Sequence, residues 1–163
     1  MYRLSNALQQ WLAMKDAVAA GLQPVAALQH FELNTACSLQ ERCKPPFTVQ
    51  WQPGGIAVLN IPALNPVADI TAPAGTTAVQ LHLMAVACRV SDTTIQAVQE
   101  QTIAYNYTTT NYPSQQIPFA LPVSNDHLLL IAVAMKYRLQ DMPERYCTKM
   151  EWLPAEVVWA VGS

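Results

Sequence analysis

The sequence predicts a mainly β protein, an immunoglobulin-like antiparallel β-sandwich of about seven strands preceded by an N-terminal helical segment. Three observations support this fold class. From Phe47 onward, apolar and polar residues alternate in several segments, which is the period of a half-buried strand. Clusters of Pro, Gly, Asn and Asp separate these segments and are typical of turns. Before residue 46 the apolar period is instead that of an amphipathic helix.

Composition limits the function classes. The chain has 163 residues, of which 52% are hydrophobic and 12% charged, with a net charge of -2. We expect one domain with two parts, a helical segment over 1–45 and a sandwich over 46–163. No cluster of Lys and Arg offers a surface for nucleic acid. No apolar run approaches the roughly 20 residues that cross a bilayer, and no secretory signal is recognisable, so a cytoplasmic location is the default expectation.

The N-terminal segment carries an apolar stripe at helical spacing, interrupted by Lys15. The stripe consists of Leu4, Leu8, Trp11, Leu12, Val18 and Leu22. Pro24 is suited to opening a second short helix that continues to Phe31. We expect this segment to pack on the sandwich or to dock on a partner. Ser38 and Glu41 have the spacing of a capping box, and Pro45-Pro46 ends the link to the sheets.

Residues 47–61 predict a β-hairpin, because two alternating runs flank Pro53-Gly54-Gly55. Residues 62–75 contain three prolines and a glycine, and we expect no regular structure there. A long strand is predicted over 78–90, with one polar face in its first half and two apolar faces in its second. The noisier alternation of 95–107 favours an exposed or edge strand.

The C-terminal third is predicted to contain the centre of the sheet. Because proline cannot donate to a ladder, the proline-bounded segment 117–121 is expected at an edge. The uninterrupted apolar run in 127–139 predicts a central strand buried on both faces. The charged segment 140–153 is interpreted as a surface loop. In the last predicted strand, 156–161, Val157, Trp159 and Val161 are expected to share one face.

A short motif adds a resemblance. The turn Ala72-Pro73-Ala74-Gly75-Thr76-Thr77 and the strand after it resemble uncharacterised helix-plus-β-sandwich proteins of gut Bacteroidetes. The resemblance covers roughly residues 1–137 and implies the same fold. That family has no assigned activity, so the resemblance implies no catalytic or binding residues.

Few residue patterns suggest catalysis. Ser124, Asp126 and His127 contain the residue types of a nucleophilic triad, but such residues are also expected in a turn before a strand. His30 and His82 have no acidic or histidine partner at ligand spacing. We therefore expect a non-catalytic protein without a metal or cofactor.

The four cysteines are too sparse for a disulfide scaffold and lack the C-x-x-C spacing of a zinc site. Cys88 is expected in the core. Cys37 and Cys43 are close enough in sequence for a local disulfide in an oxidising compartment, and this alternative stays open.

Aromatic residues are the best candidates for recognition. Tyr105, Tyr107 and Tyr112 flank a Thr-Asn loop and suit either sheet packing or contact with a sugar or a protein. Trp11, Trp51, Trp152 and Trp159 are expected to pack between segments. The leading hypothesis is a domain for protein interaction or self-association, since low charge accompanies high apolar content. The alternative is a carbohydrate- or ligand-binding module that uses the Tyr105 to Tyr112 loop. The third hypothesis is a hydrolase with an active site that cannot be recognised from the spacing of residues in the sequence.

Overall fold

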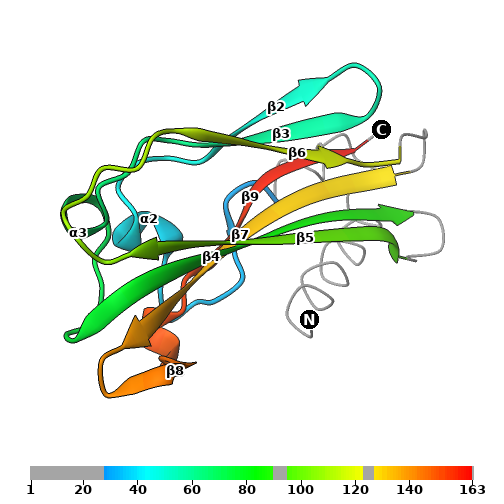
Figure 1. Ribbon diagram of the computed structural model, residues 1–163. Coiled ribbons are helices and arrows are strands. Elements are labelled where there is room, and N and C mark those ends of the chain that lie inside the picture. The colour runs from blue at the N-terminus through cyan, green and yellow to red at the C-terminus, as the bar shows by residue number, and fades with distance from the viewer. Residues whose placement is uncertain (1–27, 90–94, 123–126, 163) are drawn as a thin grey trace.

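A computed structural model describes residues 28–89, 95–122 and 127–162, with residues 142–145 described by their backbone alone. The described chain is mainly β and forms two antiparallel sheets that face each other (Figure 1). Its strands are β1 (Phe31–Glu32), β2 (Thr48–Gln52), β3 (Ile56–Ile61), β4 (Thr76–Arg89), β5 (Ile95–Asn106), β6 (Gln115–Ala120), β7 (His127–Leu139), β8 (Met142–Tyr146) and β9 (Ala155–Gly162). Its helical turns are α2 (Leu39–Arg42), α3 (Pro66–Asp69) and the 3-10 turn η2 (Met150–Trp152). All seven predicted strands are present.

The larger sheet has six strands in the order β1-β9-β7-β4-β5, with β8 paired to one end of β7. β7 is central, because β4 pairs with it along one side and β9 along the other. Every residue from His127 to Val133 is buried, as an apolar run with two covered faces requires. The prediction of a central strand is confirmed, and both Ile131 and Val133 are completely buried.

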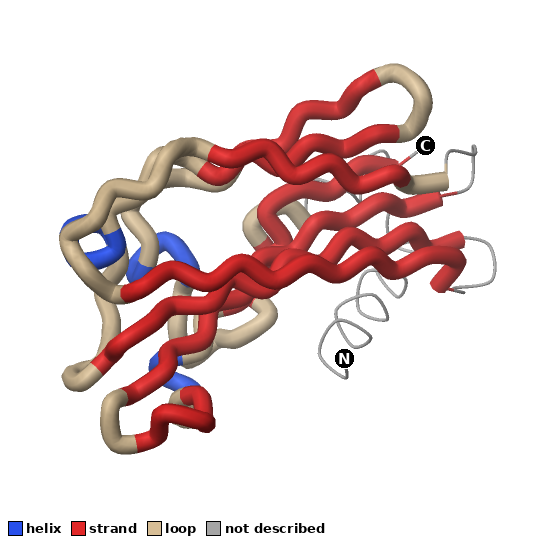
Figure 2. The backbone as a smooth tube through the Cα atoms, viewed as in Figure 1, coloured by secondary structure: helices blue, strands red, loops and turns tan. Residues whose placement is uncertain are grey.

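The smaller sheet has three strands in the order β2-β3-β6 (Figure 2). β2 and β3 form the predicted hairpin, in which Gly54 and Gly55 adopt positive φ angles that other residues rarely accept. Pro118 lies in β6, at the edge of this sheet, as predicted from its missing N–H group.

The core has two parts, one on each face of the larger sheet. The main cluster lies between the sheets and takes alternate residues of β4 and β7, among them Leu81, Leu83, Ile131 and Val133. A second cluster uses the opposite face and consists of Leu28, Val86, Cys88, Leu128, Leu130, Val157 and Ala160. The pleat separates successive side chains to these two faces. Cys88 is buried in the second cluster, as predicted.

A bulge corrects the prediction for the last strand. Val157 belongs to the second cluster, whereas Trp159 and Val161 pack against the main one. The register shifts where Ala132 pairs with Val157 and Ile131 with Trp159, so Val158 is the extra residue. One extra residue reverses the faces of all that follow. The prediction that Val157 shares a face with Trp159 and Val161 was therefore wrong.

Three local predictions were also wrong. Ser38 occupies the N-cap of α2, but its side chain makes no capping hydrogen bond, so the capping box does not form. The segment 62–75 contains α3, because Pro66 fits the first turn and the Asn65 side chain accepts from the Ala68 N–H. The charged segment 140–153 contains β8 and η2 instead of a loop alone.

The predicted second helix does not extend to Phe31. Residues 28–30 form a turn, and Phe31 begins β1, which pairs with β9. The helix predicted before residue 24 and Trp11 lie outside the described residues. The division into 1–45 and 46–163 stays a prediction, although β1 and α2 contribute to the same sheet and core as later strands.

The described tryptophans pack between segments, as expected. Trp51 of β2 stacks on Trp159 of β9, with ring centroids 5.7 Å apart, and so connects the two sheets. Trp152 meets the Tyr137 ring edge-on, and the Arg42 guanidinium lies 4.1 Å from the Trp152 ring centroid.

Candidate functional site

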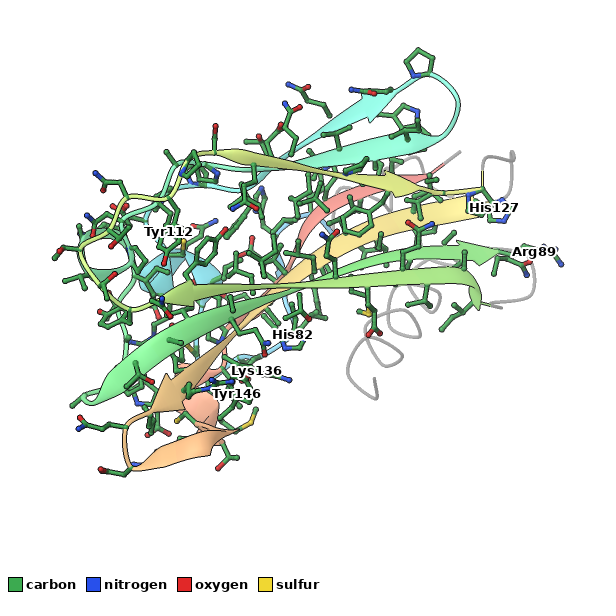
Figure 3. All side chains as sticks on the ribbon, viewed as in Figure 1. His82, Arg89, Tyr112, His127, Lys136 and Tyr146 are labelled. Carbon is green, nitrogen blue, oxygen red and sulfur yellow. The ribbon has the colours of Figure 1, made fainter. Side chains whose placement is uncertain are left out.

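The three predicted tyrosines lie together at one end of the sheets. Tyr105 and Tyr112 form an edge-to-face pair with ring centroids 4.8 Å apart. The backbone of Tyr112 is bridged to Leu64, beyond the end of the smaller sheet. Figure 3 places Tyr112 at the end that carries α2 and α3, opposite the end that carries Arg89 and His127. The three tyrosines that are grouped in the sequence are therefore also close in space.

The tyrosine rings are used in packing. Tyr105 is buried in the main core, and burial raises the pKa of its phenol. Tyr107 donates its hydroxyl hydrogen to the carbonyl of Ile70 at 2.9 Å, and the Tyr112 hydroxyl accepts from the Asn106 N–H at 3.2 Å. Tyr107 and Tyr112 are half-buried against the same core. Carbohydrate binding by the Tyr105 to Tyr112 loop stays a prediction, and no contact of these rings favours it among the described residues.

A histidine–glutamate pair, which spacing arguments did not reveal, lies between the first and last described strands. His30 Nδ1 lies 2.7 Å from Glu156 Oε1, although the two residues are 126 positions apart in sequence. Glu156 belongs to β9 and is buried, whereas His30 lies in the turn before β1 and is mostly exposed. Both line a cavity of about 430 Å³ together with Cys43, Lys44 and Phe47. The sequence offers His30 no acidic partner at ligand spacing, and the acidic partner that it has in the structure is distant in the chain.

Cys43 does not complete a nucleophilic triad with this pair. Its thiol donates to the carbonyl of Pro45 at 3.7 Å rather than to His30. Burial, reinforced by the negative charge of Asp69, raises the pKa of the Cys43 thiol to about 12. A nucleophilic cysteine needs a thiolate and a base within hydrogen-bond reach, and Cys43 has neither.

The remaining sequence candidates are separated from this cavity. His82 Nε2 lies 2.8 Å from the Gln80 side chain on the outer face of the larger sheet. Burial, together with the nearby charge of Lys136, lowers the pKa of His82. His127 is buried at the start of β7, opposite Arg89, while Ser124 and Asp126 lie outside the described residues. All four cysteines are buried and free, so Cys37 and Cys43 do not form a disulfide in this structure.

Lys136 and Arg138 both lie near the ring of Tyr146, and Figure 3 shows Lys136 beside Tyr146. Their cationic groups lie 5.9 and 5.6 Å from the ring centroid, respectively. These cation–π contacts help to hold β8 beside the C-terminal end of β7.

The outer edge of β5 is a second candidate for recognition. The strand is 12 residues long and ends the six-stranded sheet, as its alternation predicted. Ile95 and Val98 have exposed fractions of 52% and 45%. β5 contains one charged residue, Glu100, and neither Pro nor Gly. Natural edge strands are usually protected by shortness, charge or proline, and β5 has little of any of these.

Neither a metal site nor a membrane-spanning helix was found in the described part of the chain. No group of three or more His, Cys, Asp or Glu side chains there is arranged to hold a metal ion. None of the helices in residues 28–89, 95–122 and 127–162 has the length and apolar character needed to span a membrane.

No family model, curated protein or solved structure matches the chain.

Proposed function

We propose that this protein is a non-catalytic assembly domain that pairs with a second copy of itself through the edge of β5. The observation that carries the proposal is the length and low charge of that edge. Among the other edge strands of the described sheets, β1 has two residues, β2 has five, and β6 contains Pro118. In the described part of the chain, β1 pairs only with Glu156 and Val157, so the end of β9 is a shorter second open edge. An immunoglobulin-like sandwich is the finer fold assignment that we retain, supported by two antiparallel sheets that share a core.

Symmetry explains why a second copy of the chain can pair with the β5 edge. Two identical edges can pair antiparallel about a two-fold axis perpendicular to the sheet, which joins two six-stranded sheets into one. Directly opposite side chains in such a pair point to the same face of the sheet, and along one strand only every second residue points to that face. The numbers of two paired residues are therefore both even or both odd, so their sum is even. An axis at Glu100 would place two carboxylates opposite each other, which is unfavourable.

An axis at Gln101 avoids this repulsion. It pairs Glu100 with Thr102 and Val98 with Ala104 of the second copy, and it buries the exposed side chain of Val98. Gln101 then lies opposite its own copy, where two amide side chains can hydrogen-bond. We therefore propose this register.

The test uses two substitutions on the same exposed face of β5. Val98→Lys places a charge at the contact and is expected to weaken dimerisation by about tenfold or more. Glu100→Gln removes the repulsion between the two diagonal carboxylates and is expected to tighten it severalfold. Sedimentation velocity over a concentration series measures both effects.

Both side chains are exposed, so circular dichroism and melting temperature serve as folding controls for the variants. A strict monomer at high concentration would exclude assembly of this kind. A dimer that Val98→Lys leaves unchanged would place the interface on another surface.

A further inference from the structure

We infer that the cavity beside His30 and Glu156 binds a small organic cation, an amidinium or ammonium group carried on an apolar body. This site is separate from the β5 edge and does not depend on the proposed assembly. Its walls combine one buried carboxylate with apolar side chains, including Leu39, Phe47 and Val158. A mostly apolar cavity with a few polar groups that fix orientation is the usual form of a small-molecule site.

The buried carboxylate is the first reason for a cationic ligand. Glu156 has an exposed fraction of 3%, and a charge so far from water requires partners. Within the described residues its one polar side-chain partner is His30, through Oε1. Oε2 makes no hydrogen bond within the described residues, so it can accept one from a donor in the cavity.

A second carboxylate adds to the negative potential. Glu32 of β1 lies directly opposite Glu156 of β9 in antiparallel register. Directly opposite like charges in a sheet repel each other, although Glu32 is exposed and does not itself line the cavity. Lys44 also lines the cavity, and its ammonium donates to the carbonyl of Ala68 at 2.7 Å.

The neutral form of the His30 ring would supply a second acceptor. A carboxylate only accepts hydrogen bonds, so the short contact places the proton on His30 Nδ1, and in the neutral ring Nε2 is then an acceptor. The backbone of His30 has a positive φ of 61°, which a residue other than glycine rarely adopts. The backbone N–H of His30 donates to the carbonyl of Val157 at 2.8 Å, which fixes the turn against β9. Two acceptors at one cavity suit a head group with at least two N–H donors.

Benzamidine and benzamide are a matched pair of probes, since they have nearly the same shape and differ in charge. We expect benzamidine to bind and to shift the backbone amide resonances of His30, Glu156 and Val158. Benzamide is expected to bind at least about tenfold more weakly, because charge-assisted hydrogen bonds are the stronger ones. Titration followed by two-dimensional NMR gives both affinities.

Three variants separate the contributions. Glu156→Gln keeps the shape of the side chain and is expected to weaken benzamidine binding by about tenfold or more. His30→Asn removes Nε2 while retaining a residue that tolerates positive φ, and a smaller loss is expected. Val158 is an uncharged residue of the cavity wall. Val158→Phe is expected to reduce the volume of the cavity and to block benzamidine binding, while the Glu156 carboxylate is unchanged.

Equal binding of benzamidine and benzamide, retained affinity in Glu156→Gln, or the absence of any binding to the native protein would each overturn the inference. If Glu156→Gln loses its native circular dichroism, Val158→Phe provides the deciding comparison. Val98→Lys on β5 must leave benzamidine binding unchanged, so failure of the assembly proposal and failure of this one are distinguishable.

Discussion

At the scale of single residues, the environment of a side chain decides its chemistry more than its type does. Cys43, His30 and Glu156 line one cavity and are the residue types of a cysteine-based triad. Only the His30–Glu156 contact is made, and the thiol is held in its neutral form. Sequence reasoning could not find the pair, because no periodic pattern connects positions 30 and 156 until β1 pairs with β9.

The state of Cys43 is testable by thiol labelling. A pKa raised from 9.0 to about 12 reduces the thiolate fraction near pH 8 on the order of a thousandfold. We expect Cys43 to resist iodoacetamide in the native protein and to react once the protein is unfolded in urea. Peptide mass spectrometry identifies the labelled position, and Cys43→Ser is the control. Rapid native labelling of Cys43 would show that its thiol is neither buried nor neutral.

At the scale of elements, strands were predictable wherever an alternating or continuous apolar pattern reflected burial. The pattern over 127–139 predicted β7, and the proline at position 118 predicted an edge. Predictions were wrong where one residue changed the geometry, as at the Val158 bulge, which no single sequence pattern marks. β8 was missed because its residues resemble a polar loop and pair only with the end of β7.

The central position of β7 gives the second prediction. Ile131 is completely buried between β4 and β9, so Ile131→Asp places a carboxylate where no partner exists in the surrounding core. We expect this variant not to fold, since a carboxyl group buried without a partner costs a large part of the stability of a typical domain even when it becomes neutral. Ile131→Val is the matched control and is expected to lose about 1 kcal/mol. Soluble expression and thermal unfolding compare the two, and an unchanged melting temperature for Ile131→Asp would contradict the strand order.

At the scale of the whole molecule, the two sheets depend on contacts made by a few large side chains. Trp51 and Trp159 connect the free edge of the smaller sheet to β9 of the larger one. Such a contact could not be predicted in detail, because it needs the relative placement of two sheets. The expectation that both tryptophans pack between segments was nevertheless correct.

This contact gives the third prediction. Trp51→Ala is expected to lower the free energy of unfolding by about 1–2 kcal/mol, since the ring is 41% exposed but stacked. Chemical denaturation measures the loss. Trp159→Ala and the double variant complete a mutant cycle, in which strictly additive losses would show that the rings do not interact.

The order of the larger sheet also has a consequence for biosynthesis. β9 is the last described strand to be made, yet it lies inside the sheet, between β1 and β7. Until the ribosome has synthesised the residues from Ala155 onward, the backbone groups of the long hydrophobic strand β7 that later pair with β9 have no partner strand. β1 also lacks its partner strand during this time. Contacts between such distant segments slow folding and prolong the exposure of nascent chains to chaperones. The described larger sheet is complete only after β9 has left the exit tunnel.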